Sequence, residues 1–371
     1  MAGIYIHIPF CKSKCGYCDF YSDNQLNLRK EYVESVLKEI EQQYCFLSER
    51  EISSIYFGGG TPSQMTIDDC QLIIEKIKSY FFIKKEAEIT FEANPDDLNT
   101  NYLRDLIKIG INRISLGVQT FDDAGLKLMN RRHSSSQAID TVIMAQAAGF
   151  ENITLDLIYG YPGLSEELWI KNLEIAFLLT IKHLSAYHLI FEQGTPFYKL
   201  KKNKKLIEVD ESVSEKHYDI LCNEALKNGF EHYEISNFCL PGYESKHNSN
   251  YWNGTPYLGL GPSAHSFDGK IRRFNIANTK QYIELVCNQG QYWQDEILTE
   301  KDRVNEYIMI HLRTSNGIDL DEFDQIFGKK HLDRLIEVAK THKKPEKMGQ
   351  YLRISEKDLL VSDPIILDLF L

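Results

Sequence analysis

The sequence contains no apolar run of the roughly 18 residues that a membrane-spanning helix needs. No basic and apolar leader precedes the first strand-like segment at Ile4, so no secretory signal is expected. Lys and Arg number 42 against 53 Asp and Glu, and the net charge of −11 lacks the basic excess of a nucleic-acid-binding protein. Eight cysteines without an export signal are typical of a reducing compartment. We therefore expect a cytoplasmic globular protein with no nucleic-acid partner and no membrane span.

Three of the cysteines lie in one short loop, Cys11-Lys12-Ser13-Lys14-Cys15-Gly16-Tyr17-Cys18. A disulfide would leave an odd thiol, and a structural zinc site usually needs four ligands, whereas the sequence has no second CxxC pair. Buried cysteines without a metal are a further alternative. Thiolates are the soft ligands of iron–sulfur clusters, so the spacing favours a cluster. A four-iron cluster with three ligands would keep one iron open for chemistry.

Six strand patterns alternate with amphipathic helical patterns along the first two-thirds of the chain. The strands are expected at Ile4–Ile8, Ile55–Phe57, Ile89–Phe91, Arg113–Val118, Ile153–Ile158 and His183–Ile190. The helices are expected at Leu28–Phe46, Thr66–Tyr80, Leu98–Lys108, Ser136–Ala148 and Glu166–Leu179. Six β/α units in a row predict an α/β fold, a partial (β/α)6 barrel of the TIM type. In such a barrel the active site lies at the carboxyl ends of the strands.

The last third of the sequence changes character. We expect a helix at Val213–Asn228, a strand at Glu231–Phe238, and an aromatic and glycine-rich stretch with few helical signals at Tyr243–Phe267. Amphipathic patterns follow at Glu300–Thr314, Leu320–Phe327 and His331–His342, with short strands at Tyr351–Ile354 and Leu359–Val361. The sequence thus predicts a barrel at 1–235, a connecting segment at 236–290, and a small helical or winged-helix-like domain at 291–371.

Polar and glycine residues follow several of the expected strands. Gly58-Gly59-Gly60-Thr61-Pro62 comes after the second strand and is neither a GxGxxG fingerprint nor a P-loop. Glu92 closes the third strand, Gln119 the fourth, Asp156 lies in the fifth, and Arg131 is expected in the helix after the fourth. Carboxylates and amides can bind ribose hydroxyls and an ammonium group, and an arginine can bind a carboxylate. Each could also be a satisfied core residue; together they favour a zwitterionic ligand with a ribose.

The segments YIHIPFCKSKCGYCDF, GGGTP, FEANP, GVQTF and DLIYGYPG resemble the radical S-adenosylmethionine superfamily. HNSNYW and GLGPSAHSF extend the resemblance to the branch that holds oxygen-independent coproporphyrinogen III dehydrogenase (oxidase) and the HemW-type heme chaperones. The resemblance implies a [4Fe–4S] cluster on Cys11, Cys15 and Cys18, whose fourth iron binds S-adenosylmethionine. It also implies that reduction cleaves this ligand to methionine and a 5′-deoxyadenosyl radical. The implied contacts of S-adenosylmethionine are Tyr5, Tyr17, Gly59, Gly60, Thr61, Glu92, Gln119, Arg131 and Asp156.

Two functions of different classes fit this branch. A dehydrogenase would decarboxylate two propionates of coproporphyrinogen III, whereas a chaperone would bind heme and pass it to an acceptor protein. The dehydrogenases typically carry a fourth cysteine two residues after the third, where this chain has Phe20, and an extension before the first strand. Both differences favour the chaperone, so whether the protein is an enzyme stays open. The expected partners are heme or a porphyrinogen, a heme-acceptor protein, and an electron donor such as a flavodoxin or ferredoxin.

The motif His247-Asn248-Ser249-Asn250-Tyr251-Trp252 resembles the HNxxYW motif of the chaperone branch, for which heme binding has been proposed. An imidazole can ligate heme iron, and aromatic rings can pack on the macrocycle. We therefore take His247 as a heme contact; the alternative is that it caps a turn while Tyr251 and Trp252 fill an interface. His265 is a weaker heme candidate. No CxxCH sequence indicates covalent heme attachment.

Overall fold

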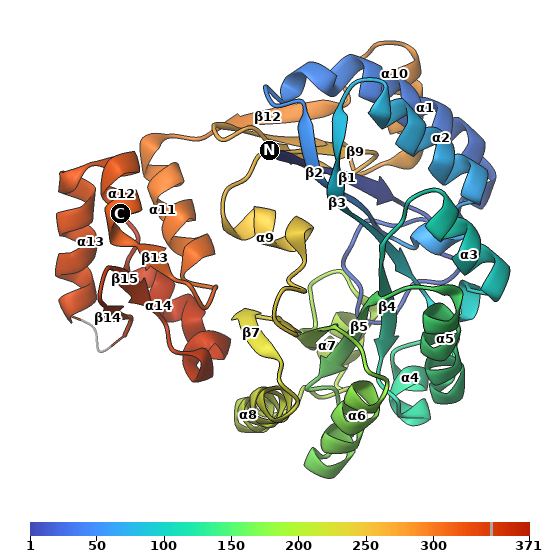
Figure 1. Ribbon diagram of the computed structural model, residues 1–371. Coiled ribbons are helices and arrows are strands. Elements are labelled where there is room, and N and C mark those ends of the chain that lie inside the picture. Colours follow the sequence, from blue (N-terminus) through green and yellow to red (C-terminus); the bar gives the residue numbers. More distant parts are fainter. Residues whose placement is uncertain (342–343) are drawn as a thin grey trace.

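The structure, a computed structural model, describes residues 1–341 and 344–371. Its core is a twelve-stranded sheet that curls into an open barrel with helices along the outer side (Figure 1). The strands follow the order β12-β11-β10-β9-β1-β2-β3-β4-β5-β6-β8-β7. The six β/α units at the centre of this sheet confirm the predicted α/β fold, a partial (β/α)6 barrel.

The six central strands run parallel to one another, as right-handed β/α units require. They are β1 (Ala2–Ile8), β2 (Glu51–Gly59), β3 (Phe82–Ala93), β4 (Arg113–Gln119), β5 (Asn152–Tyr159) and β6 (His183–His188). The helices between them are α1 (Arg29–Gln43), α2 (Ile67–Lys78), α3 (Thr100–Lys108), α4 (Asp123–Leu128), α5 (Ser135–Ala148) and α6 (Glu166–Leu178). Short 3-10 turns lie at η1 (Leu26–Leu28), η2 (Tyr44–Phe46), η3 (Pro62–Gln64) and η4 (Pro95–Asp97).

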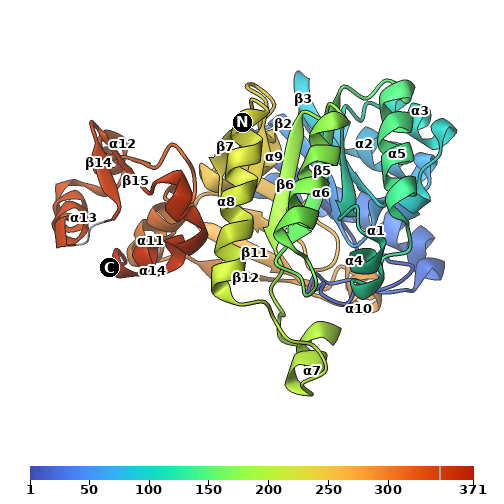
Figure 2. The same cartoon turned by 90° about the horizontal axis from the view of Figure 1, so that it is seen from below.

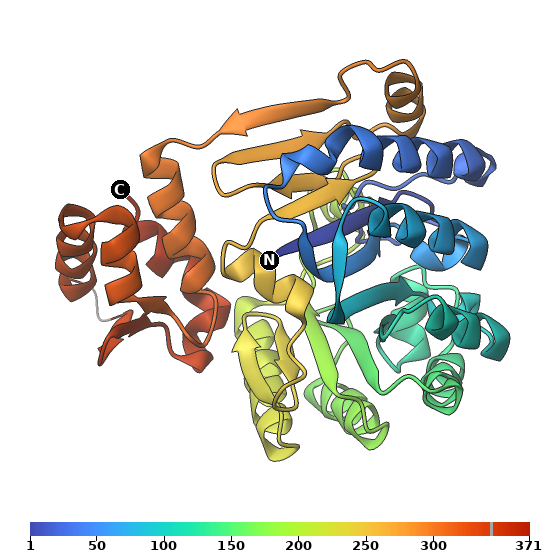
Figure 3. The ribbon, with the colours of Figure 1, turned by 45° about the horizontal axis from the view of Figure 1, so that its top comes forward.

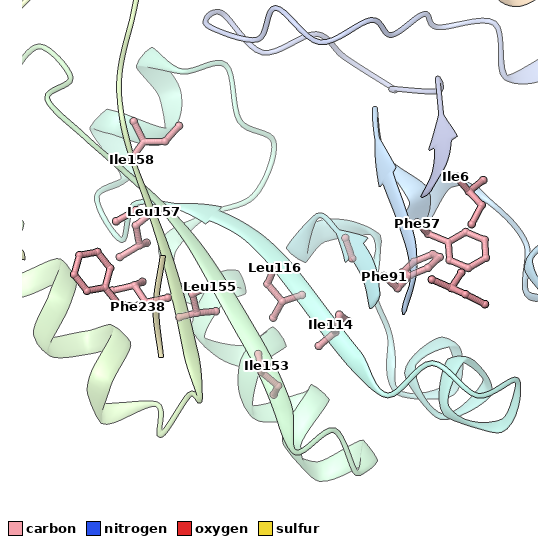
Figure 4. Packing of buried hydrophobic residues seen from close by; sticks show 14 of the residues in the cluster. Ile6, Phe57, Phe91, Ile114, Leu116, Ile153, Leu155, Leu157, Ile158 and Phe238 are labelled. Atoms are coloured by element: carbon pink, nitrogen blue, oxygen red, sulfur yellow. The ribbon is translucent and has the colours of Figure 1, made fainter. Parts of the chain in front are cut away.

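Apolar and polar side chains alternate along the central strands, because successive residues of a strand point to opposite faces. Ile114 and Leu116 of β4 belong to the buried apolar cluster, as do Ile153 and Leu155 of β5 (Figure 4). The residues between them are polar and contact one another across strands. Arg113 donates to Thr154 Oγ1 at 2.6 Å, and Ser115 donates to Asp156 at 3.1 Å. One face of the sheet therefore supplies the core, and the other supplies polar groups to the inside of the barrel.

The sheet extends beyond β1 and β6 with strands that are mostly absent from the sequence predictions. On one side lie β9 (Tyr257–Leu260), β10 (His265–Phe267), β11 (Ile271–Asn275) and β12 (Trp293–Ile297), and on the other lie β8 (Asn237–Cys239) and β7 (Glu231–Glu234). β9 pairs parallel with β1. The buried carboxylate of Glu39 in α1 fixes this extension, because it accepts 2.7 Å hydrogen bonds from Gly261 N and Asn275 Nδ2.

Three local predictions for the second half of the chain are wrong. Glu231–Phe238 is not one strand. The chain reverses direction within this segment and forms the antiparallel pair β7 and β8. The stretch 243–267 contains a helix, α9 (Lys246–Trp252), whose first amide groups donate to the distant carboxylate of Glu88. The predicted strand Leu359–Val361 is part of a 3-10 helix, η5 (Glu356–Val361), which begins where Asp358 N donates to Ser355 O at 2.8 Å.

The C-terminal elements form a separate group of helices beside the barrel, with a small antiparallel sheet (Figure 1). They are α11 (Glu300–His311), β13 (Ile318–Asp319), α12 (Leu320–Phe327), α13 (Lys329–Thr341), β14 (Glu346–Met348), β15 (Tyr351–Arg353) and α14 (Ser362–Asp368). The predicted helix at 331–342 thus corresponds to α13, except that His342 lies outside the described residues. The domain limits remain predictions, and β12 lies beyond residue 290 although it pairs with β11 of the large sheet.

Three further helices complete the barrel, namely α7 (Pro196–Lys202), α8 (Glu211–Lys227) and α10 (Thr279–Cys287). Figure 2 shows α7 standing out from the body of the molecule below β6. Figure 3 shows β9, β10, β11 and β12 continuing the sheet past β1. Within 1–341 and 344–371, no helix has the length and apolar character to cross a bilayer.

Candidate functional site

A cavity of about 430 Å³ opens at the carboxyl ends of the central strands. Its wall includes the cysteine loop after β1, the segment after β2, the last residues of β3, β4 and β5, and the residues after β6. Parallel strands bring their carboxyl ends to one edge, which is where barrels of this kind carry their sites. The fold therefore gathers segments that are far apart in sequence around one space.

All three cysteines of the loop line this cavity. Cys11, Cys15 and Cys18 are free thiols and partly buried. Backbone hydrogen bonds hold the loop at both ends: Cys11 N donates to Asp23 O at 2.9 Å, and Gly16 N donates to Met129 O at 3.1 Å. The loop is thus a fixed part of the cavity wall, and its thiols face a common space.

Polar groups from neighbouring elements contact two of these thiols. The Cys11 Sγ lies 3.3 Å from Thr61 Oγ1, and Arg131 Nη1 donates to Cys15 Sγ at 3.3 Å. Burial raises the pKa of the Cys18 thiol to about 11 and also raises the pKa of Cys11. A cysteine binds metal as the thiolate, so its proton must leave. The positive charge of a bound iron–sulfur core would therefore lower the pKa of both thiols.

The three thiols are not arranged around a single ion. In the part of the chain that the structure describes, no three His, Cys, Asp or Glu side chains form a site for one metal ion. In a four-iron cluster each cysteine binds a different iron, so the three sulfur atoms stand further apart than the ligands of one ion. A donor set of three separate thiols around an open cavity fits a cluster with one uncovered iron.

Arg131 sits deep in the wall, but not in the helix where it was predicted. Helix α4 ends at Leu128, and Asn130 adopts a left-handed conformation with φ +60°, which asparagine tolerates better than most residues. The chain therefore turns, and Arg131 lies in the connection to α5. Its Nη2 donates to Asn94 Oδ1 and to Gly117 O, both at 2.6 Å. These bonds fix the guanidinium beside Cys15.

The glycines at the end of β2 and just after it have two different structural roles. Gly59 has φ +103°, and a Cβ there would lie 2.7 Å from the His7 ring, so this glycine serves packing and does not line the cavity. Gly60 and Thr61 do line it. The Gly60 amide donates to Ile8 O at 2.7 Å, and a Cβ would lie 2.8 Å from that same oxygen. Gly60 thus allows the cysteine loop to start directly against β2.

Two carboxylates lie in the inner part of the cavity wall. Burial raises the pKa of Glu92 to about 7 and that of Asp156 to about 6, although hydrogen bonds from Tyr56 and Ser115 act in the opposite direction. Neither carboxylate forms an ion pair with any residue that the structure describes. Partly buried acidic groups with raised pKa values are typical of functional sites, and a cationic ligand would lower both pKa values.

Seven of the ten predicted ligand contacts line the cavity together with the three cysteines, and three do not. Those that line it are Tyr17, Gly60, Thr61, Glu92, Gln119, Arg131 and Asp156. Gln119 has φ +68°, which side chains rarely adopt, and strain of this kind is frequent at binding sites. Gly59, Tyr5 and His247 are not part of the wall; the Tyr5 hydroxyl instead lies 3.2 Å from His7 Nδ1.

His247 is buried behind the cavity, with 1% of its surface exposed. Its Nδ1 lies 2.9 Å from Ser54 Oγ, and its Nε2 lies 2.9 Å from the Tyr251 hydroxyl. The ring stacks on Tyr56 at 5.0 Å, and burial lowers the pKa of His247 to about 3. Both ring nitrogens thus have partners inside the protein, and the role of His247 as a heme contact stays a prediction.

Several residues of the wall were absent from the sequence predictions. Asn94, which positions Arg131, follows Glu92 by two residues, and its place just after a strand was the available signal. Phe20, Tyr187 and Ile190 line the cavity and are 64%, 43% and 57% exposed. We call these three the apolar rim. No sequence pattern identified the apolar rim, because Phe20 is far from Tyr187 and Ile190 in the sequence and comes near them only in the folded barrel.

Residues 5–176 match the radical SAM superfamily, the class of protein that the curled sheet and the cysteine loop define. The heme chaperone HemW of Lactococcus lactis subsp. lactis is 34% identical and aligns over 87% of this chain and 84% of its own length. The heme chaperone HemW of Bacillus subtilis is 34% identical, over 89% of this chain and 88% of its own. The chain belongs to the HemW family.

A solved structure shows the same fold. The coproporphyrinogen III oxidase HemN of Escherichia coli, a radical SAM enzyme, superimposes with a TM-score of 0.84 over 100% of this chain and 90% of that one. The two sequences are 22% identical, so this likeness concerns the fold.

Proposed function

We propose that this protein is a heme chaperone that binds a [4Fe–4S] cluster and S-adenosylmethionine, carries heme, and transfers it to an acceptor protein. The observation that carries the proposal is the meeting of three free thiols, one guanidinium and two partly buried carboxylates around one cavity. The heme part is supported by the relatives, which are named heme chaperones. We further propose the cytoplasm as its compartment, and a flavodoxin or ferredoxin as its electron donor.

Cys11, Cys15 and Cys18 would hold the cluster, because they are the thiols on the cavity wall and none is in a disulfide. When bound, the cluster supplies one electron to the sulfonium of S-adenosylmethionine. The chain itself limits access to this centre. Tyr17 lies inside the loop and lines the cavity, and Arg131 covers Cys15.

The remaining wall residues would bind S-adenosylmethionine by charge and shape. Arg131 can attract the carboxylate of the amino acid end by its positive charge, while its Nη1 and Nη2 groups stay on Cys15, Asn94 and Gly117. Glu92 and Asp156 can accept from the ammonium group and from ribose hydroxyls. Gly60 and Thr61 line the cavity and would contact the ligand there. The ligand would thereby give Glu92 and Asp156 the positively charged partner that they do not have among the residues that the structure describes.

The apolar rim offers a surface for the flat face of heme. Phe20, Tyr187 and Ile190 stand exposed beside the cavity, and aromatic and aliphatic side chains pack well on a macrocycle. His247 is 1% exposed, and it can ligate heme iron only if the ring becomes accessible and one of its two hydrogen bonds breaks. We therefore propose that heme contacts the rim and not His247.

Heme titration separates these two sites. The wild-type protein should bind about one heme per chain, followed by visible absorbance. The double variant Phe20→Ser, Ile190→Ser should weaken binding about tenfold or more, since each side chain contributes roughly 1 kcal/mol of apolar contact. His247→Ala should leave the heme spectrum unchanged while lowering the melting temperature, because it empties a buried, hydrogen-bonded position.

The matched control is Leu178→Ser, Leu226→Ser, which removes two exposed apolar side chains elsewhere on the surface, 82% and 74% exposed. It should bind heme like the wild type. An altered heme spectrum in a folded His247→Ala variant, together with normal binding by the rim variant, would show that heme binds at His247 and not at the apolar rim.

The enzymatic alternative is tested by anaerobic incubation with coproporphyrinogen III, a reductant and S-adenosylmethionine. Phe20 stands where the dehydrogenases typically carry a fourth cysteine, so we expect no protoporphyrinogen IX above a control without protein. Robust formation of protoporphyrinogen IX by the reconstituted protein would overturn the chaperone assignment in favour of an oxidase.

A further inference from the structure

The residues after β6 form a basic projection beside the cysteine loop. Segment 195–207, TPFYKLKKNKKLI, has five lysines and no acidic residue, in a chain whose net charge is −11. It comprises α7 and the turn that follows, and α7 stands out from the body of the molecule (Figure 2). We call this segment, residues 195–207, the lysine projection. Its local charge is opposite to that of the rest of the protein.

The lysines of the projection are free for a partner. All five are exposed. Lys201 forms an ion pair with Glu208, whereas Lys199, Lys202, Lys204 and Lys205 form none with the residues that the structure describes. Four unpaired positive charges within seven residues repel one another, and this repulsion destabilises the free protein. An anionic partner surface would relieve the repulsion.

The projection is attached directly to the cysteine loop. Phe197, at the start of α7, is buried, and its backbone amide donates to Gly16 O at 2.9 Å. A Cβ on Gly16 would lie 2.3 Å from the Phe197 ring, and the rings of Phe197 and Tyr17 stand 6.4 Å apart, edge to face. Gly16 and Tyr17 lie between the second and third cysteines. The lysines are therefore held beside the part of the loop that would bind the cluster.

We propose that the lysine projection is the docking surface for a small acidic protein that delivers single electrons to the cluster. The inference rests on the proposed function, because it requires the cluster. Electron transfer slows steeply with distance, so a donor must dock close to the loop. In this step the donor is oxidised by one electron and the cluster is reduced by one, with no bond made or broken.

An anionic membrane is the other partner that a basic segment can bind. The structure favours a protein, because α7 has seven residues and is too short to lay a continuous apolar face into a bilayer. Charge complementarity with an acidic redox protein needs only a compact patch, and such pairing raises association rates 10- to 1,000-fold at low salt.

The test reverses three unpaired charges of the projection, Lys199→Glu, Lys202→Glu and Lys205→Glu. The matched control reverses three exposed lysines of the C-terminal region, Lys330→Glu, Lys347→Glu and Lys357→Glu, which form no ion pair with residues 1–341 or 344–371. Both variants change the net charge equally. The probe is a reduced flavodoxin, mixed anaerobically with the reconstituted protein while cluster absorbance is followed.

We expect the projection variant to be reduced at least tenfold more slowly than the wild type at low salt, and the control variant less than threefold more slowly. The wild-type rate should fall as salt increases, because screening removes the attraction. Titration with oxidised flavodoxin should show the same difference in affinity. Reduction by dithionite, a small molecule that needs no docking surface, should proceed equally in all three proteins.

Equal flavodoxin rates in the two variants would overturn the inference. So would loss of binding to phosphatidylglycerol vesicles in the projection variant with an unchanged flavodoxin rate, which would identify the segment as a membrane contact. Iron and sulfide content and dithionite bleaching are measured first. A protein with no cluster would contradict the proposed function itself, whereas a reducible cluster with unaltered flavodoxin kinetics would contradict only the docking surface.

Discussion

Alanine in place of Cys11, Cys15 or Cys18 is expected to abolish the iron–sulfur cluster, each change on its own. The wild-type protein after anaerobic reconstitution should contain about four iron and four sulfide per chain, as a four-iron cluster requires. With one thiol removed, two ligands cannot hold the cube against solvent, so both contents should fall close to zero. The visible absorbance should disappear with them.

The cysteines outside the loop provide the control for this experiment. Cys45 and Cys287 are exposed free thiols far from the loop in sequence. Cys45→Ala and Cys287→Ala should each keep the full iron and sulfide content. If a loop variant kept a stable cluster while Cys45→Ala or Cys287→Ala lost it, the ligands would have been wrongly assigned.

Replacing Arg131 should produce the second large effect, a loss of S-adenosylmethionine affinity of roughly 100-fold in Arg131→Ala. The guanidinium contacts Cys15 Sγ, Asn94 Oδ1 and Gly117 O, so its removal would take away the proposed partner of the ligand carboxylate and leave these partly buried acceptors without a donor. Truncating one partner of a buried charged pair typically costs about 2–5 kcal/mol. Arg131→Lys should restore little, because an ammonium group cannot reproduce the three contacts that the guanidinium makes with Cys15, Asn94 and Gly117.

Arg132 is the matched control at the next position. It is more exposed and pairs with Asp96 and Asp97 at the edge of the cavity. Its guanidinium is held by these two carboxylates and contacts none of the three loop cysteines, so Arg132→Ala should change the S-adenosylmethionine affinity less than fivefold. Equilibrium binding to the reconstituted protein measures both variants. Equal losses at the two positions would mean that general positive charge, and not the position of Arg131, determines binding.

The sequence predicted the barrel, and it indicated which edge of the sheet would carry the candidate site, because both depend on local patterns. Alternating strands and helices identify the six β/α units, and parallel strands must bring their carboxyl ends together. This rule alone is enough to place Glu92, Gln119 and Asp156 near the cysteine loop. Their role as ligand contacts stays a prediction.

The sequence failed where partners that are distant along the chain decide the local structure. Helix α9 forms in a glycine- and aromatic-rich stretch because the carboxylate of Glu88 caps its first amides. The sequence also could not place His247 against Ser54 and Tyr56, which lie far from it along the chain, and its role as a heme contact stays a prediction. The strands β9, β10, β11 and β12 have three to five residues each, and pairing with their neighbours, not propensity, sets their conformation.

Electron paramagnetic resonance of the reduced, reconstituted protein, recorded with and without S-adenosylmethionine, tests the central claim most directly. The account predicts the signal of a reduced four-iron cluster that changes shape when S-adenosylmethionine is added, because the ligand occupies the iron that no cysteine binds. A signal that is identical in both samples, or no cluster signal at all, would contradict it.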